Sequence, residues 1–183
     1  LASSKGTSRN LCSLVLTPSR LLFLLSVAGF SCCVAMSMPQ VHIVAYCSDL
    51  GFGVARGAEM LSLMLVGGAI TRILSGFLAD RIGGVKTLLI GSFLQGVAPM
   101  FYLPFDGLVS LYVISAMFGI AQGGIVPCYA IIVREHMSAK IAAERVGFLI
   151  MMTIFGMGFG GWSSGWIYDI SGSYQAAFLH GIG

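Results

Sequence analysis

One arginine lies deep inside an otherwise uncharged, apolar stretch. Arg72 is the single charged residue between Met60 and Ala79, and it precedes Asp80 by eight residues. In a helix, it would lie about 12 Å from the end that Asp80 marks. An ionisable group at that depth in a membrane normally faces a cavity or a partner. Because a guanidinium offers parallel donors to a carboxylate, we predict that Arg72 binds an anionic substrate. The alternative is a structural arginine bonded to carbonyl groups and water.

Three further polar residues lie in apolar stretches that could border the same cavity. His42 precedes Asp49 by seven residues, and an imidazole there could bind substrate or take up a proton near neutral pH. Tyr46 follows one turn later. Gln122 lies beside a glycine pair, and membrane helices interrupted in this way often border a binding cavity. The predicted substrate-binding set is therefore Arg72, His42, Tyr46 and Gln122, and hydrogen bonding for packing is the competing interpretation of the last three.

The composition decides the environment of these residues. Of the 183 residues, 57% are hydrophobic and 9% are charged, whereas a soluble domain carries about 25% charged residues. So few charges cannot cover a water-facing surface, which excludes a soluble enzyme. The net charge of +3, without a basic stripe, gives no basis for nucleic-acid binding. The five cysteines lack metal-ligand spacing, so neither a metal nor a cofactor is predicted.

Charged residues divide the chain into runs long enough to cross a bilayer, which takes about 20 residues in a helix. Because lipid offers the backbone no hydrogen-bond partner, each run should be helical. We therefore expect an all-α, multi-pass membrane protein with five complete spans and a truncated sixth, cut from a larger protein. The predicted spans are residues 21–48, 58–79, 87–105, 107–133, 146–168 and 174–183.

Proline and glycine inside the spans predict where helices bend and where they touch. Bends are expected at Pro39, Pro99 and Pro127. Glycines four residues apart let helix backbones approach closely, and packing is the expected role of such pairs. These pairs are Gly119/Gly123, Gly156/Gly160 and Gly161/Gly165.

The distribution of basic residues predicts the orientation. Lysine and arginine gather in the N-terminal segment and in the loops after the second and fourth spans, whereas the other loops are mainly acidic. Since cytoplasmic loops carry the excess of basic residues, the N-terminal segment should be cytoplasmic, in a plasma or inner membrane. The residues on the basic side are Lys5, Arg9, Arg20, Arg81, Lys86, Arg134, Lys140 and Arg145.

The loop after the second span carries a family signature. The loop resembles the signature of the major facilitator superfamily, which joins the second and third helices of each six-helix half. The shared pattern is a glycine, three residues, Asp-Arg, one residue, a glycine and then a basic residue. Independently of the family, Gly83 and the glycine after it permit a tight reversal. The resemblance implies that this loop gates access together with Glu144 and Arg145, which open the fifth span. A further acid–base pair, Arg134 and Glu135, closes the fourth span. We expect these four residues to be interfacial anchors and ion pairs. The signature residues are Gly76, Asp80, Arg81, Gly83 and Lys86.

The resemblance extends along most of the chain. Residues 39–51 are similar to the end of the seventh helix in monocarboxylate-transporter-like members, and residues 161–174 to the end of the eleventh helix and the next turn. This implies that residues 20–183 are the C-terminal bundle and residues 1–19 the remnant of the central cytoplasmic loop. A missing N-terminal six-helix half would complete the protein.

The family also suggests a substrate. Monocarboxylate transporters and oxalate/formate antiporters have an arginine at the offset of Arg72, and it binds the carboxylate. The second cation of the oxalate transporter, a lysine in the eleventh helix, has no counterpart in residues 146–168, and Gly68 replaces an acid of animal monocarboxylate transporters. One cation favours a monocarboxylate, moved by alternating access with a proton or a counter-anion.

Two other functions remain open at this stage. A drug or sugar facilitator would have the same spans with a structural Arg72. A haem-binding membrane subunit could use His42 and His180, which would lie at similar depth, although their surroundings lack a haem signature.

Overall fold

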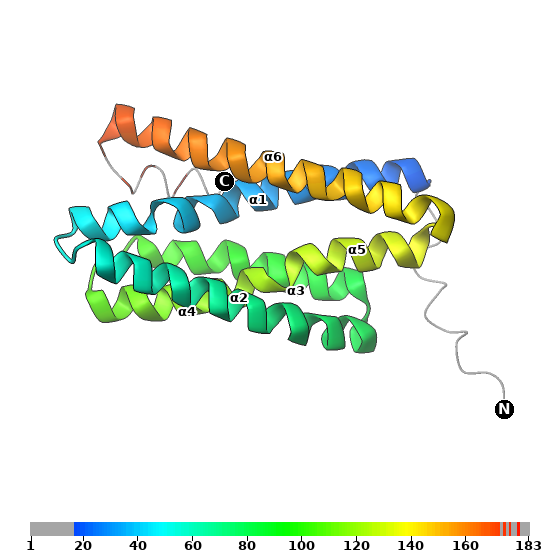
Figure 1. Cartoon of the computed structure of the whole chain (residues 1–183), viewed down its shortest axis with the longest axis horizontal. Helices are drawn as coiled ribbons and strands as arrows, with labels where there is room; N and C mark the ends of the chain where they lie inside the picture. Colours follow the sequence, from blue (N-terminus) through cyan, green and yellow to red (C-terminus); the bar gives the residue numbers. More distant parts are fainter. Residues whose placement is uncertain (1–16, 173, 175, 177–178, 180–183) are drawn as a thin grey trace.

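The computed structural model describes residues 17–172 together with Tyr174, Ala176 and Leu179, and the regular structure of this part is helical throughout. Six α-helices and one 3₁₀ helix form five antiparallel stretches along the long axis, because η1 continues α3 and α5 continues α4 (Figure 1). The elements are α1 (Pro18–Asp49), α2 (Val54–Ile82), α3 (Gly84–Val97), η1 (Ala98–Tyr102), α4 (Leu108–Gly123), α5 (Ile125–His136) and α6 (Ala139–Ser171).

Within the described residues, five stretches are long and apolar enough to cross a membrane, which confirms the predicted all-α membrane fold. They are α1, α2, α3 with η1, α4 with α5, and α6. The predicted sixth span lies outside the described residues except for Tyr174, Ala176 and Leu179. The two ends of the bundle are named here after glycines in their turns: the Gly83 end, where α1 and α6 begin, and the Gly51 end.

The helices run past most ends of the predicted uncharged spans. α1 begins at Pro18 and ends at Asp49, and α2 reaches from Val54 to Ile82. Charged residues such as Arg20 and Arg56 therefore lie in helical end turns. A helix end at the membrane surface can expose its charged side chains to water, so the first charge does not mark the last helical residue.

Two of the predicted bends coincide with changes in helix geometry. The fourth span is divided at Gly124, which separates α4 from α5, and Pro127 lies in the first turn after the break. Pro99 lies where α3 gives way to η1. Pro39, by contrast, lies inside α1, which is continuous over 32 residues.

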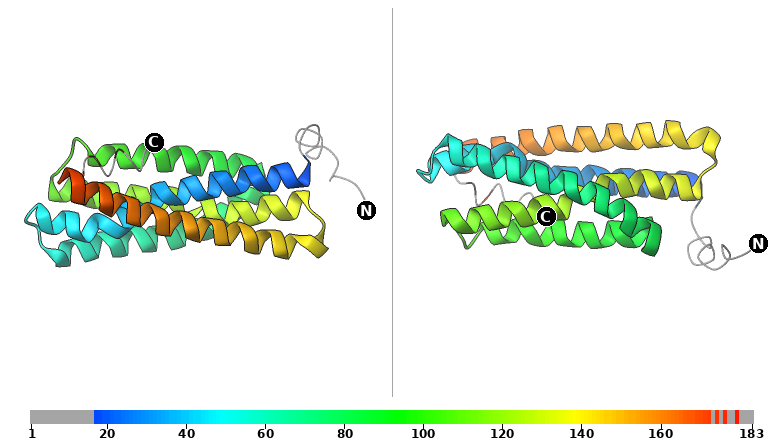
Figure 2. Two further views of the ribbon diagram at one scale, coloured as in Figure 1. Left: turned by 90° about the horizontal axis from the view of Figure 1, so that it is seen from above. Right: turned by 60° about the horizontal axis from the view of Figure 1, so that its bottom comes forward.

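Glycines hold the helices together in two close pairs, α1 with α6 and α2 with α4, which lie side by side in Figures 1 and 2. A Cβ on Gly119 or Gly123 of α4 would collide with the backbone of α2, at Met64 and Gly68. Two further glycines, in α6, would collide in the same way with α1. The packing role predicted for these pairs is confirmed. The glycines of α6 in question are Gly156 and Gly160.

Gly161 and Gly165 approach α1 less closely. A Cβ on Gly161 would meet Val41 at 3.4 Å, and one on Gly165 would meet His42 at 3.6 Å. These are ordinary or slightly tight contacts, because the neighbours are side chains and not backbone atoms. The third glycine pair therefore leaves room for the side chains of α1.

Two clusters of buried apolar side chains fill the bundle. The cluster towards the Gly51 end includes Met38, Ile43 and Phe118. The cluster towards the Gly83 end includes Leu25, Leu88, Ile125, Ile132 and Leu149. The level between them is the middle of the described bundle.

Replacing Gly123 by alanine should destabilise the bundle, because the new methyl group meets the backbone of Gly68 and neither helix can yield cheaply. We expect a loss of about 1–3 kcal/mol in unfolding free energy, measured by denaturant-induced unfolding in mixed micelles. The matched control is Gly96→Ala in α3, where a Cβ meets no atom within 4 Å. The control should be as stable as the parent protein or slightly more stable. Equal effects of the two substitutions would contradict the close-packing interpretation.

Candidate functional site

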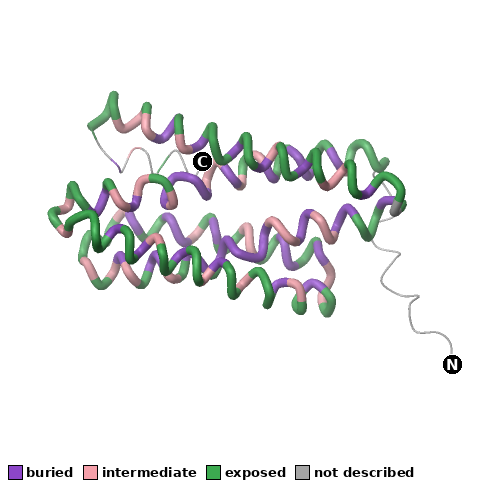
Figure 3. The backbone as a smooth tube through the Cα atoms, viewed as in Figure 1, coloured by how far each residue is buried: buried purple, intermediate pink, exposed green. Residues whose placement is uncertain are grey.

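Arg72 lies in α2, ten residues before the helix ends at Ile82, with an exposed side chain. Arg72, Gly76 and Asp80 follow at intervals of four residues and therefore lie along one face of the helix. A strip of large, exposed apolar side chains runs beside this face; Figure 3 shows the exposed positions along α2. Leu65, two turns before Arg72 on the same face, is exposed as well, so Arg72 and Asp80 are charged residues on an otherwise apolar exposed surface. The apolar strip consists of Val66, Ile70, Ile73 and Phe77.

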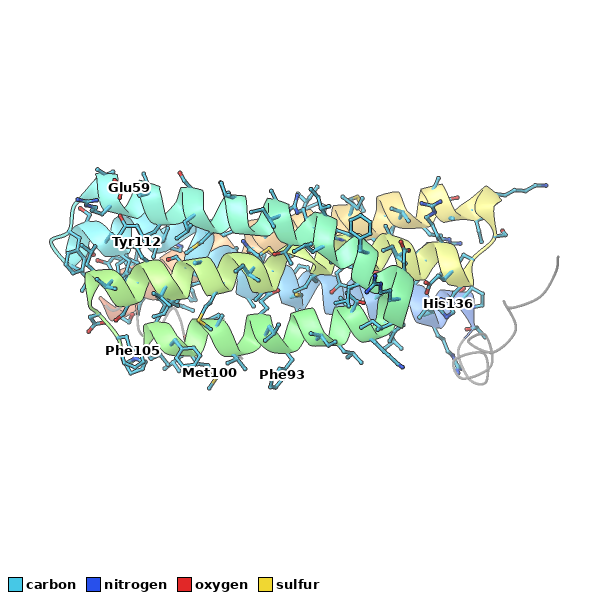
Figure 4. All side chains as sticks on the ribbon, turned by 90° about the horizontal axis from the view of Figure 1, so that it is seen from below. Glu59, Phe93, Met100, Phe105, Tyr112 and His136 are labelled. Atoms are coloured by element: carbon cyan, nitrogen blue, oxygen red, sulfur yellow. The ribbon has the colours of Figure 1, made fainter. Side chains whose placement is uncertain are left out.

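The guanidinium of Arg72 has no salt bridge within the described part of the chain. The salt bridge found there joins Arg56 Nη1 to Glu59 Oε2 at 3.0 Å, at the far end of α2. The Tyr112 hydroxyl also donates to Glu59, and both residues lie together at the Gly51 end (Figure 4). The backbone of Arg72 is held in place, since Ser75 Oγ donates to its carbonyl oxygen at 3.0 Å. Arg72 is therefore positioned by its helix and left without a counter-charge.

Gln122 is buried at the end of α4 and makes an interhelical hydrogen bond. Gln40 Nε2 donates to Gln122 Oε1 at 2.9 Å. Gln40 is half-buried and follows Pro39 in α1. The two amides thus connect the proline of α1 with the break between α4 and α5, at the level between the two apolar clusters. Gln40 was not among the predicted substrate residues, although its place after an intramembrane proline is a usable signal.

Helix packing brings Gln122 and Arg72 to the same level of the bundle. A Cβ on Gly68, one turn before Arg72, would lie 3.7 Å from Gln122 Nε2. Ser75, one turn after Arg72, packs against Gly124, where a Cβ would lie 2.8 Å from that of the serine. The break between α4 and α5 therefore lies beside the turn of α2 that carries Arg72.

His42 is half-buried between α1 and α6. Its Nε2 lies 3.2 Å from the carbonyl oxygen of Gly161, and its ring centroid lies 6.2 Å from that of Tyr174. This contact with the backbone of α6 is the kind of hydrogen bond that serves packing. The other histidine considered for a haem, His180, lies outside the described residues.

Tyr46 belongs to a polar cavity at the Gly51 end and not to the level of Arg72. Its hydroxyl donates to Asp106 Oδ1 at 2.9 Å. In the same cavity, which measures about 370 Å³, Tyr168 donates to Asp49 Oδ2 at 2.7 Å. Tyr46 lies six residues beyond Gln40, or about 9 Å along the helix. Of the four predicted substrate residues, Arg72 and Gln122 are therefore at one level and Tyr46 is not. His42, two residues beyond Gln40, is about 3 Å from that level but is in contact with α6.

The signature loop has the predicted tight reversal. Gly83 has φ +91°, a backbone conformation that residues with a side chain rarely adopt. It is both the C-cap of α2 and the N-cap of α3. Gly84 packs against α5, where a Cβ would lie 3.0 Å from Ile132. Asp80, Arg81 and Lys86 are exposed around the turn. The reversal is thus fixed by the glycines, and the charged side chains are free to contact another segment.

Glu144 and Arg145 lie near the start of α6 at the same end of the bundle, the glutamate exposed and the arginine half-buried. The ion pairs expected among the charges that close α5 and open α6 do not occur in the described residues. Neighbours in sequence such as Glu144 and Arg145 point about 100° apart on a helix, so they do not face each other. The charged residues of the Gly83 end therefore have no ionic partner within this part of the chain.

The fold and the site define a multi-pass membrane bundle with an unpaired intramembrane arginine and a charged loop at one end. A family model agrees with that class: residues 13–182 match the description Major Facilitator Superfamily. The chain belongs to the major facilitator superfamily of membrane transporters.

The chain is similar in sequence to several curated relatives. The chain is 26% identical over 144 residues to monocarboxylate transporter 13 of Rattus norvegicus and of Bos taurus, covering 78% of this chain and 34% of each relative. It is also 26% identical over 156 residues to the multidrug export protein EmrB of Haemophilus influenzae, covering 80% of this chain and 31% of the relative. The chain thus spans about a third of the length of these relatives.

The hydrogen bond between Gln40 and Gln122 should contribute to stability. In a double-mutant cycle with Gln40→Leu and Gln122→Leu, we expect a coupling energy of about 0.5–2 kcal/mol, the range of interhelical hydrogen bonds in membranes. The measurement is the unfolding free energy of the four proteins in mixed micelles. A cycle on Gln40 and Gln95, which have no hydrogen bond to each other here, is the control. Strictly additive effects of the Gln40 and Gln122 substitutions would contradict the contact.

Proposed function

We propose that this chain is the C-terminal bundle of a secondary active transporter that moves a small organic anion by alternating access. Arg72 is the observation that carries the proposal. The family membership, the position of the signature loop between the second and third spans, and the similarity to monocarboxylate transporter 13 support it. An N-terminal six-helix half would supply the other wall of the cavity.

The proposed substrate site lies at the level of Arg72 and Gln122. The guanidinium binds the carboxylate through two parallel N–H donors, which is a stronger contact than either donor makes alone. Gln122 lies at the floor of this site, where its hydrogen bond with Gln40 holds the amide in one orientation. Because this part of the chain supplies Arg72 with no counter-ion, the substrate takes that role.

The transport cycle couples substrate movement to a proton or to a counter-anion. In the anion-exchange mode, one anion replaces another at Arg72, so the transporter returns to its starting conformation with the site occupied. In symport, a proton enters with the anion, and His42 is the candidate acceptor because it lies two residues beyond Gln40, near the level of the site. Both modes need the rocking of two bundles around a midplane site.

The charged residues of the Gly83 end form the proposed gate. Asp80, Arg81, Lys86 and Glu144 are exposed, and they have no ionic partner in the described residues. Their partners would lie on the other half, so that contacts form when one side of the transporter closes and break when it opens. The excess of basic residues supports a cytoplasmic location for this end and for the N-terminal segment.

A second candidate is drug export, which the similarity to the multidrug export protein EmrB favours. In that case Arg72 is a structural residue that bonds to carbonyl groups and water. The two candidates differ in what happens when Arg72 is replaced.

Replacing Arg72 by glutamine or lysine in the intact protein should weaken uptake of a labelled monocarboxylate such as lactate. A hydrogen-bonded ionic contact is lost or made monodentate, so the apparent affinity should fall about 10- to 100-fold. Uptake into proteoliposomes at equal protein density is the measurement. Arg56→Gln is the matched control, because Arg56 lies on the same helix, is already paired with Glu59 and should leave uptake unchanged. If the Arg72 variants take up monocarboxylate as well as the parent protein does, and export a drug, the second candidate is favoured.

The proposed orientation predicts which turns a membrane-impermeant thiol reagent can reach. In a protein without its native cysteines, Ser138→Cys lies at the Gly83 end and Gly107→Cys at the Gly51 end. Intact cells should label the cysteine at 107, and the cysteine at 138 should be labelled only after permeabilisation. The reverse pattern would contradict the orientation.

A further inference from the structure

Gln122 is a buried amide that has a hydrogen-bond partner at one end only. Its side chain is 5% exposed, and its Oε1 accepts the hydrogen bond from Gln40 Nε2 at 2.9 Å. A glutamine amide also has two N–H donors on Nε2. Among the described residues, the Nε2 of Gln122 has no hydrogen-bond partner. It is not enclosed either, because the enclosed side-chain atom without a partner in this part of the chain is Ser164 Oγ. Gln122 Nε2 therefore borders open space.

Gln95 shows how a buried glutamine is satisfied when it serves packing alone. It is 2% exposed, and both ends of its amide bond to one residue of α1. Its Nε2 donates to the carbonyl oxygen of Cys32 at 2.8 Å, and its Oε1 accepts from Cys32 Sγ at 3.1 Å. An unpaired donor is costly in apolar surroundings. The unpaired end of Gln122 thus differs from a packing contact and suits a ligand.

The unpaired end of Gln122 faces the turn of α2 that carries Arg72. A Cβ on Gly68 would lie 3.7 Å from Gln122 Nε2, and Gly68 precedes Arg72 by one turn on the same face. A guanidinium has donors and no acceptor, and the same is true of an amide NH₂ group, so the two cannot bond to each other. One acceptor between them can satisfy both. A carboxylate suits this role, because its two oxygens offer about four lone-pair sites.

Gln40 determines which end of the Gln122 amide faces α2. Because Gln40 presents its Nε2 donor, Gln122 turns Oε1 towards α1 and leaves Nε2 next to α2. If the amide were reversed, Oε1 would face the bound carboxylate, and two acceptors would repel each other. The orientation of one amide therefore changes the polarity that the site offers to an anion.

We propose that Gln122 Nε2 is a second donor to the substrate carboxylate beside Arg72, and that Gln40 is the positioning residue that turns this donor towards α2. The inference rests on the proposed function, since the substrate supplies the acceptor. The site then presents donors from two helices, and it selects a carboxylate by hydrogen bonding as well as by charge.

Lactate uptake by the intact protein in proteoliposomes tests the proposal through methionine variants. Methionine is close to glutamine in length and has no N–H donor, and KM does not depend on the amount of folded protein. Gln122→Met should raise the KM for lactate about 10-fold and leave the maximal rate unchanged, because one hydrogen bond to a charged ligand is lost. Gln40→Met should raise the KM about threefold, because the Gln122 amide remains but is free to rotate.

The double variant distinguishes positioning from packing. In the Gln122→Met background, Gln40→Met should not raise the KM further, because no amide is left for Gln40 to orient. Gln122→Glu should raise the KM more than Gln122→Met does, because it places an acceptor where the substrate needs a donor. The matched control is Gln95→Met in α3, which removes a buried interhelical amide and should leave the KM unchanged.

Three results would overturn the proposal. A Gln122→Met protein with the KM of the parent would show that Nε2 does not contact the substrate. Additive effects of Gln40→Met and Gln122→Met on the logarithm of KM would give Gln40 a role independent of Gln122. Equal KM values for Gln122→Glu and Gln122→Met would show that this position does not need a donor. Failure of the proposed function is distinguished by the Arg72 variants, which would then also keep the KM of the parent.

Discussion

Inside a bilayer, a polar group can form hydrogen bonds only with the protein, and this constraint shapes the contacts of the bundle. The helices satisfy their own backbones. Short polar side chains return to the backbone of their helix, as Ser26 Oγ does to the carbonyl oxygen of Leu22 at 2.8 Å. Longer amides reach across to another helix, as Gln95 Nε2 does to the carbonyl oxygen of Cys32 at 2.8 Å. Arg72 departs from this pattern, because the described residues hold no counter-charge for it.

Glycine contacts and polar contacts together connect the helices of the bundle. Glycine contacts join α1 to α6 and α2 to α4, and Gly57 of α2 also meets the backbone of Val44 in α1. Between these two pairs, the Gln40–Gln122 hydrogen bond acts in the middle and the Tyr46–Asp106 hydrogen bond acts at the Gly51 end. A bundle held at two levels in this way is suited to move as one body. Rigid-body movement is what the proposed rocking of two halves requires.

The sequence predicted the spans and the turns better than it predicted the contacts. Uncharged runs located the five described spans, and paired glycines located the close approaches, because both follow from rules that apply to each segment alone. The faces of the helices could not be predicted in this way. In water, an apolar stripe marks the buried side of a helix. Lipid is as apolar as the core, so the exposed Phe77 and the buried Met64 of α2 are both large apolar residues.

The sequence also could not predict which residues of distant segments are in contact. His42 and Tyr46 are one turn apart in α1, and their shared position in sequence suggested a shared site. The structure gives them different partners, the backbone of α6 for His42 and Asp106 for Tyr46. Which groups meet depends on how the helices cross, and helix crossing is set by contacts such as that of Gly160 with Val34. The turn at Gly83 was predictable because its cause is local.

The charge balance at Arg72 limits what the proposed site can hold when it closes. An unpaired charge in a dry cavity is costly, so closing around the arginine is favourable only when an anion accompanies it. One carboxylate cancels one guanidinium and leaves the occluded site neutral. A dicarboxylate would leave a negative charge that the described residues 146–168 do not neutralise, since they contain no lysine or arginine. In the proposed site, the same cost that makes an intramembrane arginine rare would link closure of the site to its loading with an anion.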